Sequence, residues 1–253
     1  MMITYRQLDH CAIHATDGDI GGCRDVLFDD QDFVVRYLVA DTNTWLPLSR
    51  KVVLSPISIT ELNKEEHKVH VAMTRQELKD SPSIEEHKPV SREYEEMLFK
   101  YFGYGYYWIG PGAWGDFAHP TELVDAELDK SREQSEPQKP ENHMRSCSEI
   151  IGYDLATLDG EIGHISDFLV EESGWQIKAL VVDTHNWLPG GKKLLLMPAD
   201  ILSFDWSTHK VNVNLAREAL LARPEIETDR LDDPAYRKHL LEQLGKSQTP
   251  PQN

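Results

Sequence analysis

The stretch Asp159-Gly160-Glu161-Ile162-Gly163 recurs near the start of the chain, with one residue changed, as Asp17-Gly18-Asp19-Ile20-Gly21. The two copies lie 142 residues apart, and the same offset aligns residues 38–47 with residues 180–189. In those segments Leu-Val-Ala-Asp-Thr aligns with Leu-Val-Val-Asp-Thr, and both segments end in Trp-Leu-Pro. The offset holds without a gap as far as Gly103 and Gly245. A series of this length predicts two homologous domains joined by a connector.

Short strands and turns dominate the second copy. Asp159-Gly160 is typical of a hairpin turn. Residues 175–182 begin with alternating apolar side chains and end as a continuous apolar run, which predicts a buried central strand. Shorter apolar runs follow, divided by Pro198 and by the polar residues 207–210. Five or six short antiparallel strands in about 65 residues favour a mainly β fold, with a small closed or nearly closed barrel in each copy.

The region between the copies has a different composition. Residues 91–102 begin with a serine suited to cap a helix and carry apolar residues at helical spacing. An aromatic segment, residues 104–114, follows with several Gly and Pro residues. We therefore expect four parts: a first barrel in residues 1–86, a helix with the aromatic segment and a charged linker in residues 87–145, a second barrel in residues 146–227, and a short helix with a tail in residues 228–253.

The charge of the chain excludes some partners. Its 253 residues carry 43 acidic and 26 basic side chains, a formal net charge of −17. Nucleic acids and anionic membranes both attract basic surfaces, so neither is an expected partner. No apolar run approaches the ~18–20 residues that span a bilayer, and the N-terminus lacks the pattern of a signal peptide. Three cysteines without a CxxC pair are typical of a reducing compartment, so we expect a cytoplasmic protein.

The motifs in combination resemble those of the PRC-barrel domain. In the second copy they are residues 159–168, Leu180–Thr184, Leu194–Pro198 and Val211–Val213, and the first copy matches them at residues 17–21, 38–42, 52–56 and 69–71. The whole chain is similar to bacterial proteins in which two such domains flank a Tyr/Trp-rich connector. The resemblance implies a small, strongly bent β-barrel in each copy. Similar domains form the cytoplasmic part of the photosynthetic reaction-centre H subunit and half of a ribosome maturation factor, which are docking roles without bond-making chemistry.

Asp41 and Asp183 end the central strand of each copy and are the candidate ligand or metal carboxylates. The alternative is that Asp and the following Thr cap a turn through bonds to backbone N–H groups. Acidic pairs in matched turns, such as Asp29-Asp30 and Glu171-Glu172, are a weaker candidate for Ca²⁺. His10, Cys11 and His14 form the tightest group of soft ligands, with Cys23 nearby, but they do not share a helical face, and we expect no metal there.

Aromatic residues supply the candidate contacts with a protein partner. Two equivalent loops carry Trp45, Leu46 and Pro47 in the first copy and Trp187, Leu188 and Pro189 in the second. Each is either a partner anchor or a lid on its barrel. The aromatic segment adds Tyr104, Tyr106, Tyr107, Trp108 and Trp114, which either dock a partner or pack back on a barrel.

Catalytic templates are absent from the sequence: it has no GxSxG, HExxH, P-loop or dinucleotide fingerprint. Together with the resemblance, this predicts a non-enzymatic scaffold or adaptor that binds another protein, or itself as a homo-oligomer, without a cofactor. The alternative is a binding protein that responds to a small ligand or a divalent metal through Asp41 and Asp183 or through the acidic turns.

Overall fold

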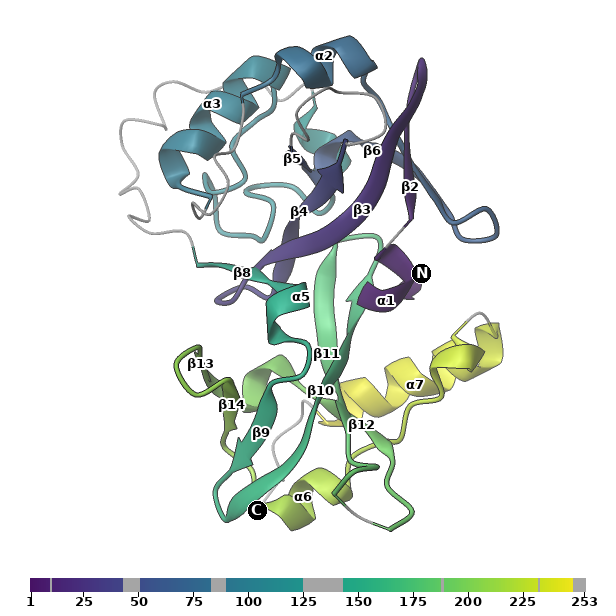
Figure 1. Cartoon of the computed structure of the whole chain (residues 1–253), viewed down its shortest axis with the longest axis vertical. Coiled ribbons are helices and arrows are strands. Elements are labelled where there is room, and N and C mark those ends of the chain that lie inside the picture. The colour runs from purple at the N-terminus through teal and green to yellow at the C-terminus, as the bar shows by residue number, and fades with distance from the viewer. Residues whose placement is uncertain are drawn as a thin grey trace. The chain divides into compact units, whose positions relative to one another are not determined.

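The computed structural model describes residues 1–9, 11–42, 51–82, 90–124, 143–187, 189–231 and 233–247. The chain divides into two compact units (Figure 1). The first-repeat unit comprises Gln7–Ser146 and Ser173–Gln176, and the second-repeat unit comprises Met1–Arg6, Cys147–Glu172 and Ile177–Asn253. The fold is mainly β, as predicted, and no helix among the described residues is long and apolar enough to cross a membrane.

The duplication is visible in the elements themselves, because each strand of the first repeat has a counterpart 142 residues later with the same bounds. The first repeat contains β2 (Ala12–Ala15), β3 (Gly18–Asp29), β4 (Val34–Asp41), β5 (Lys51–Leu54), β6 (Ile59–Asn63) and β7 (Lys68–Val71). The second contains β9 (Asp154–Thr157), β10 (Gly160–Glu171), β11 (Gln176–Asp183), β12 (Lys193–Leu196), β13 (Ile201–Asp205) and β14 (Lys210–Val213).

Helices occur at matching places. A short helix opens each repeat, α1 (Tyr5–Leu8) and α5 (Cys147–Ile150), and a 3₁₀ turn, η1 (Pro56–Ser58) or η3 (Pro198–Asp200), joins the last two hairpins. The helices that follow are α2 (Arg75–Asp80) and α3 (Arg92–Phe102) in the first repeat, and α6 (Arg217–Leu221) and α7 (Pro234–Ser247) in the second. The 3₁₀ turns η2 (Pro120–Leu123) and η4 (Thr228–Arg230) are the other helical elements of the described residues.

Both sheets have the same strand order, β5-β4-β3-β2-β7-β6 and β12-β11-β10-β9-β14-β13. The prediction of purely antiparallel sheets was wrong for one pair in each, because β7 runs parallel to β2 and β14 runs parallel to β9. The reason is that the last hairpin returns to the first strand of the sheet, where its second strand lies beside β2 or β9. The sheet is therefore mixed, and the two closed antiparallel barrels are not confirmed.

Each sheet is nevertheless strongly curled. In the first repeat β5 and β6 lie at opposite ends of the strand order, yet only residues 55–58 connect them. Five peptide steps reach at most about 18 Å. The outer strands of a flat six-stranded sheet would lie about 24 Å apart. The two ends of the sheet must therefore approach each other, although they do not pair among the described residues.

Each sheet takes one short strand from the segment that precedes the other repeat. β1 (Met2–Thr4) begins the chain but pairs with β10, where Ile3 lies opposite Val170. β8 (Met144–Ser146) precedes the second repeat but pairs with β3, where Arg145 lies opposite Phe28. The two registers are equivalent. The bounds of the two compact units therefore differ from the bounds of the predicted domains, because Met1–Arg6 belongs to the second-repeat unit and Ser173–Gln176 to the first-repeat unit.

The repeated Asp-Gly-x-Ile-Gly motif has a structural role in both units. Asp17 Oδ1 accepts a hydrogen bond of 2.8 Å from the backbone N–H of Arg75, at the first turn of α2, and Asp159 does the same for Arg217. The closing glycine lies against the neighbouring strand. A Cβ on Gly21, whose φ is +150°, would lie 1.8 Å from the carbonyl oxygen of Asp41. The motif therefore caps a helix and lets two strands approach closely.

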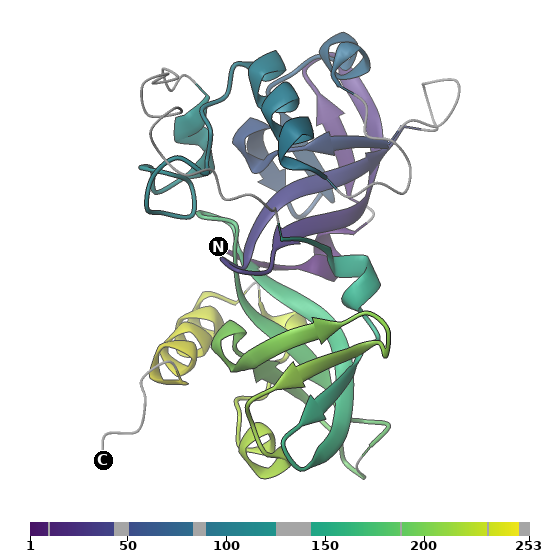
Figure 2. The ribbon, with the colours of Figure 1, turned by 90° about the vertical axis from the view of Figure 1, so that its left-hand side faces the viewer.

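The last helix of the second-repeat unit packs against the core of that unit. Leu169, Ala179, Val181 and Leu195 from the sheet pack with Leu240 of α7, which is yellow in Figure 2. In the first repeat, α3 buries Tyr94, Leu98 and Phe99 in the same way. Ser91 is the N-cap of this helix, as the sequence predicted, and Gly103, in the αL conformation, is its C-cap.

Candidate functional site

The aromatic segment is mostly buried within the first-repeat unit. Tyr104, Tyr106, Tyr107 and Trp114 are each at most 9% exposed, and only Trp108 is half-buried. The indole N–H of Trp114 donates a 2.7 Å hydrogen bond to the carbonyl oxygen of Gly174, in a turn that belongs to the same unit. The segment therefore packs back on its own unit, which was one of the two alternatives for these residues.

Two arginines alternate with the rings of this segment. The guanidinium of Arg36, on β4, lies 3.8 Å from the ring centre of Tyr107 and 4.8 Å from that of Trp114. The guanidinium of Arg92, on α3, lies 4.2 Å from the ring centre of Trp108 and 5.4 Å from that of Tyr107. The resulting order is Trp114, Arg36, Tyr107, Arg92 and Trp108. Such cation–π contacts are worth about 2 kcal/mol when desolvated.

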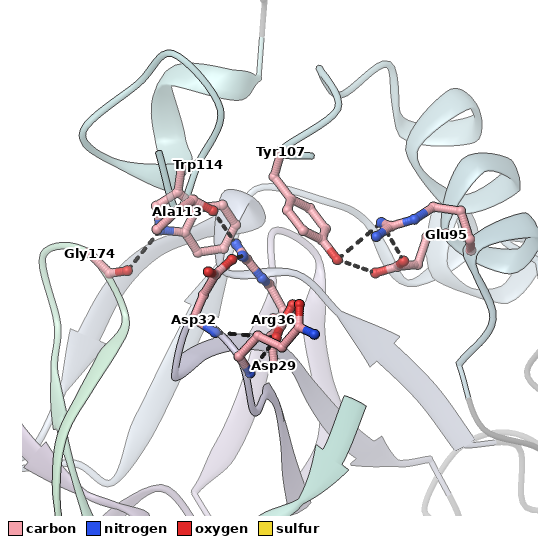
Figure 3. A network of polar contacts seen from close by, with 10 residues as sticks. Asp29, Asp32, Arg36, Glu95, Tyr107, Ala113, Trp114 and Gly174 are labelled. Carbon is pink, nitrogen blue, oxygen red and sulfur yellow. Dashed lines mark hydrogen bonds and ion pairs between the residues drawn. The ribbon is translucent and has the colours of Figure 1, made fainter. Parts of the chain in front are cut away.

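Glu95 is the acidic centre of this arrangement (Figure 3). Its carboxylate is 0% exposed and accepts hydrogen bonds from the hydroxyls of Tyr37 and Tyr107, both at 2.8 Å, and from Arg92 at 2.7 Å. Arg36 is also buried, and it donates to the carbonyl oxygen of Ala113 and to the carboxylate of Asp32 at 3.4 Å. We call Arg36, Arg92, Glu95, Tyr37 and Tyr107 the buried polar network.

The network is a structural support for the aromatic segment, and each of its two arginines is paired with a carboxylate. Burial, followed by the nearby charge of Glu95, raises the pKa of the Tyr37 and Tyr107 hydroxyls, so both stay protonated donors at neutral pH. The Nε atoms of both arginines are buried and find no hydrogen-bond partner among the described residues. Each guanidinium nevertheless has a carboxylate partner and aromatic rings on its faces. The network ties the aromatic segment to β4 and α3.

The second repeat has no such network, because Lys178, Ala179 and Arg237 occupy the positions of Arg36, Tyr37 and Glu95. Sequence reasoning missed the network, since its members lie far apart along the chain: the bond from Tyr37 to Glu95 spans 58 residues. The available signal was the difference between the repeats. An arginine, a tyrosine and a glutamate stand in the first copy where the second has a lysine, an alanine and an arginine.

Asp41 and Asp183 lie at the ends of β4 and β11, as expected. One oxygen of Asp183 accepts hydrogen bonds from the backbone N–H of His185 at 2.9 Å and from its ring nitrogen at 2.7 Å. Burial acts to raise the pKa of Asp183, but these bonds outweigh it and lower the pKa. Asp41 forms an ion pair of 3.6 Å with Arg24. In Asp183 the contacts are those of a turn-capping side chain.

The other candidate residues lie in several different environments. Trp187 is 40% exposed and Pro189 is also exposed, whereas Trp45, Leu46, Pro47 and Leu188 lie outside the described residues, as does His10. The thiols of Cys11 and Cys23 are buried and donate to carbonyl oxygens of Gln7 and Asp25. His14 hydrogen-bonds Asp19 at 2.7 Å. Across the described residues, no group of three or more His, Cys, Asp or Glu side chains is placed to hold a metal ion.

Exposed apolar residues distinguish the two repeats. In the second, Leu158, Leu202 and Leu221 are 43–67% exposed, and the equivalent residues of the first repeat are Thr16, Thr60 and Lys79. In the first, Met97 and Tyr101 are exposed on α3, where the second has His239 and Gln243. Two units with the same framework therefore present different apolar surfaces. No model of a known protein family and no curated protein matches the chain.

Proposed function

We propose that the chain is a non-enzymatic adaptor in which two PRC-barrel-like repeats bind protein partners through different surfaces. One observation carries the proposal: the two units share strand bounds and strand order, yet their exposed apolar residues lie at different positions. A surface residue that packing does not require is free to diverge, and exposed apolar residues are a common feature of protein-binding sites. The resemblance to the PRC-barrel domain supports the same role.

The buried polar network fits this proposal as part of the framework. Glu95, Tyr37 and Tyr107 satisfy one another inside the unit. They hold the aromatic segment in one arrangement, and a fixed arrangement lowers the entropy lost when a partner binds. We further propose that the protein acts in the cytoplasm, where its free cysteines stay reduced.

Affinity capture from the source cell, with the 253-residue chain as bait, tests the adaptor function. One variant, Leu202→Thr with Leu221→Lys, gives the second repeat the residues of the first. A matched variant, Met97→His with Tyr101→Gln, gives the first repeat the residues of the second. We expect each variant to lose a different subset of the captured proteins. Identical captured sets for the wild type and both variants would contradict the proposal.

A further inference from the structure

Two histidines lie side by side on the outer face of the first-repeat sheet. His14 of β2 and His70 of β7 occupy directly opposite positions of this parallel pair of strands. Both side chains are half-buried, whereas the preceding residues, Ile13 and Val69, point to the other face and are fully buried in the core. The two imidazole rings are in contact, with centres 5.2 Å apart and planes 68° apart. The sheet therefore presents two imidazoles at one place on its surface.

Carboxylates lie on both sides of the histidine pair. Asp19 of β3 is opposite His14, and its Oδ1 lies 2.7 Å from Nδ1 of His14. Glu61 of β6 is opposite His70. Opposite residues of neighbouring strands share a face of the sheet. Four adjacent strands therefore contribute one row of polar side chains, in the order Glu61, His70, His14 and Asp19.

The basic residues nearest to this row are matched by other carboxylates. Lys68 and Arg75 both attract the charge of Asp19. Lys68 also forms a 2.7 Å ion pair with Glu66, and Arg75 forms a 3.8 Å ion pair with Asp17. These ion pairs offset the two cations, so the carboxylates of the row leave the surroundings of the histidines negative, which favours a bound cation.

The contact with Asp19 determines which nitrogen of His14 is available to a metal ion. When the carboxylate accepts the Nδ1–H of His14, Nε2 becomes the ligand atom, and metal-binding histidines are commonly supported in this way. Among the described residues, no hydrogen bond involves Nε2 of His14 or either ring nitrogen of His70. Two imidazoles on one tetrahedral zinc ion, with Zn–N bonds of about 2.0–2.1 Å, have ring centres about 5 Å apart. The observed separation of 5.2 Å agrees with that geometry.

The second repeat shows that the fold does not require the histidine pair. Ala156 and Asn212 occupy the positions of His14 and His70, on two strands that pair in the same parallel register. The imidazoles are therefore specific to the first repeat, although the strands that carry them are equivalent. Two half-buried histidines that packing does not require are available for binding.

We propose that His14 and His70 bind one divalent transition-metal ion, represented by Zn²⁺, and that Asp19 is the carboxylate that positions His14. This metal site is independent of the proposed adaptor function. Imidazole nitrogen suits Zn²⁺, Cu²⁺ and Ni²⁺, whereas Mg²⁺ and Ca²⁺ prefer oxygen ligands. Two protein ligands leave the other positions of the ion to water. Asp19 is not a third ligand, which agrees with the absence, in the described part of the chain, of any group of three or more metal-binding side chains.

Isothermal titration calorimetry with ZnCl₂ tests the site on the 253-residue chain, prepared without a histidine tag. We expect one Zn²⁺ to bind per chain, and excess Mg²⁺ to leave the affinity unchanged. The variant His14→Ala with His70→Asn, which carries the second-repeat residues, should abolish this binding. Asp19→Ala should weaken it about 10–100-fold, the usual effect of removing such a carboxylate. Both variants should keep the circular dichroism spectrum of the wild type, because these side chains lie outside the core.

The matched control is His164→Ala with His185→Ala, which removes the two histidines that interact with Asp183 in the second repeat and should leave the affinity unchanged. NMR of the histidine rings locates the ion, and the signals of His14 and His70 should shift when Zn²⁺ is added. Absence of binding, equal affinity in the His14/His70 variant, an equal loss in the control, or shifts confined to other histidines would each overturn the inference. The adaptor function would be unaffected, since its capture experiment changes other residues.

Discussion

The buried polar network gives the sharpest stability prediction. Replacing Glu95 with alanine removes a carboxylate that is 0% exposed and accepts three hydrogen bonds. Arg92 then loses its carboxylate, and the hydroxyls of Tyr37 and Tyr107 lose their acceptor. Breaking a buried ion pair from one side costs about 3–5 kcal/mol, and each neutral group left unsatisfied costs about 1–3 kcal/mol.

These terms are not additive, because the three donors share one carboxylate. We expect Glu95→Ala to lower the free energy of unfolding of the first-repeat unit by about 4–6 kcal/mol, and Glu95→Gln, which keeps the shape and one acceptor, by about half as much. A domain is stable by only about 5–15 kcal/mol, so the alanine variant should be close to unfolded.

Urea denaturation followed by tryptophan fluorescence measures the change, because Trp108 and Trp114 lie in the segment that the network holds. The matched control is Arg237→Ala, at the equivalent position of the second repeat. Arg237 donates a 3.2 Å hydrogen bond to the carbonyl oxygen of Leu231, and its loss should cost under about 1 kcal/mol. A cost below about 1 kcal/mol for Glu95→Ala would refute a cooperative role for the network.

Three further predictions follow from the fold. Gly21→Ala should lower the free energy of unfolding by about 3 kcal/mol or more, because the new Cβ would lie 1.8 Å from the Asp41 carbonyl oxygen. Gly103→Ala, whose Cβ would have nothing within 4 Å, should lower it by about 1–2 kcal/mol because of the left-handed backbone. Urea titration compares the two variants, and equal losses of stability would count against the close approach of the strands. Burial raises the pKa of Tyr107 in the folded state, so the contribution of Tyr107 to stability should be constant below pH about 10, where unfolded tyrosine ionises. Above that pH the contribution should fall by up to about 1.4 kcal/mol per pH unit; Tyr107→Phe should show a shallower fall of stability at high pH, and an unchanged slope would contradict this. Burial likewise raises the pKa of the Cys23 thiol, so a thiol reagent at pH 8 should label it only after denaturation, and rapid labelling of the native protein would contradict its buried position.

The sequence predicted the duplicated strands well, because the 142-residue offset marks each of them. The turn signals at Asp17-Gly18 and Asp159-Gly160, and the apolar runs at the two central strands, correspond to hairpins and buried strands in the structure. These signals are local, and local patterns determine which segments form strands.

Long-range pairing was harder to predict. Nothing in Met2–Thr4 indicates that it pairs with β10 rather than with its own repeat, because the two repeats offer equivalent strands. The parallel pairing of β14 with β9 depends on the return of a hairpin across the sheet.

As an adaptor, a single chain should hold two partners at once on different surfaces. Light scattering after size exclusion tests it directly, using the chain mixed with one partner captured through each repeat. We predict a complex whose mass is the 29.0 kDa chain plus both partners, and each repeat variant should lose only its own partner from that complex. Competition between the two partners for one chain, or the loss of both in either variant, would contradict the claim.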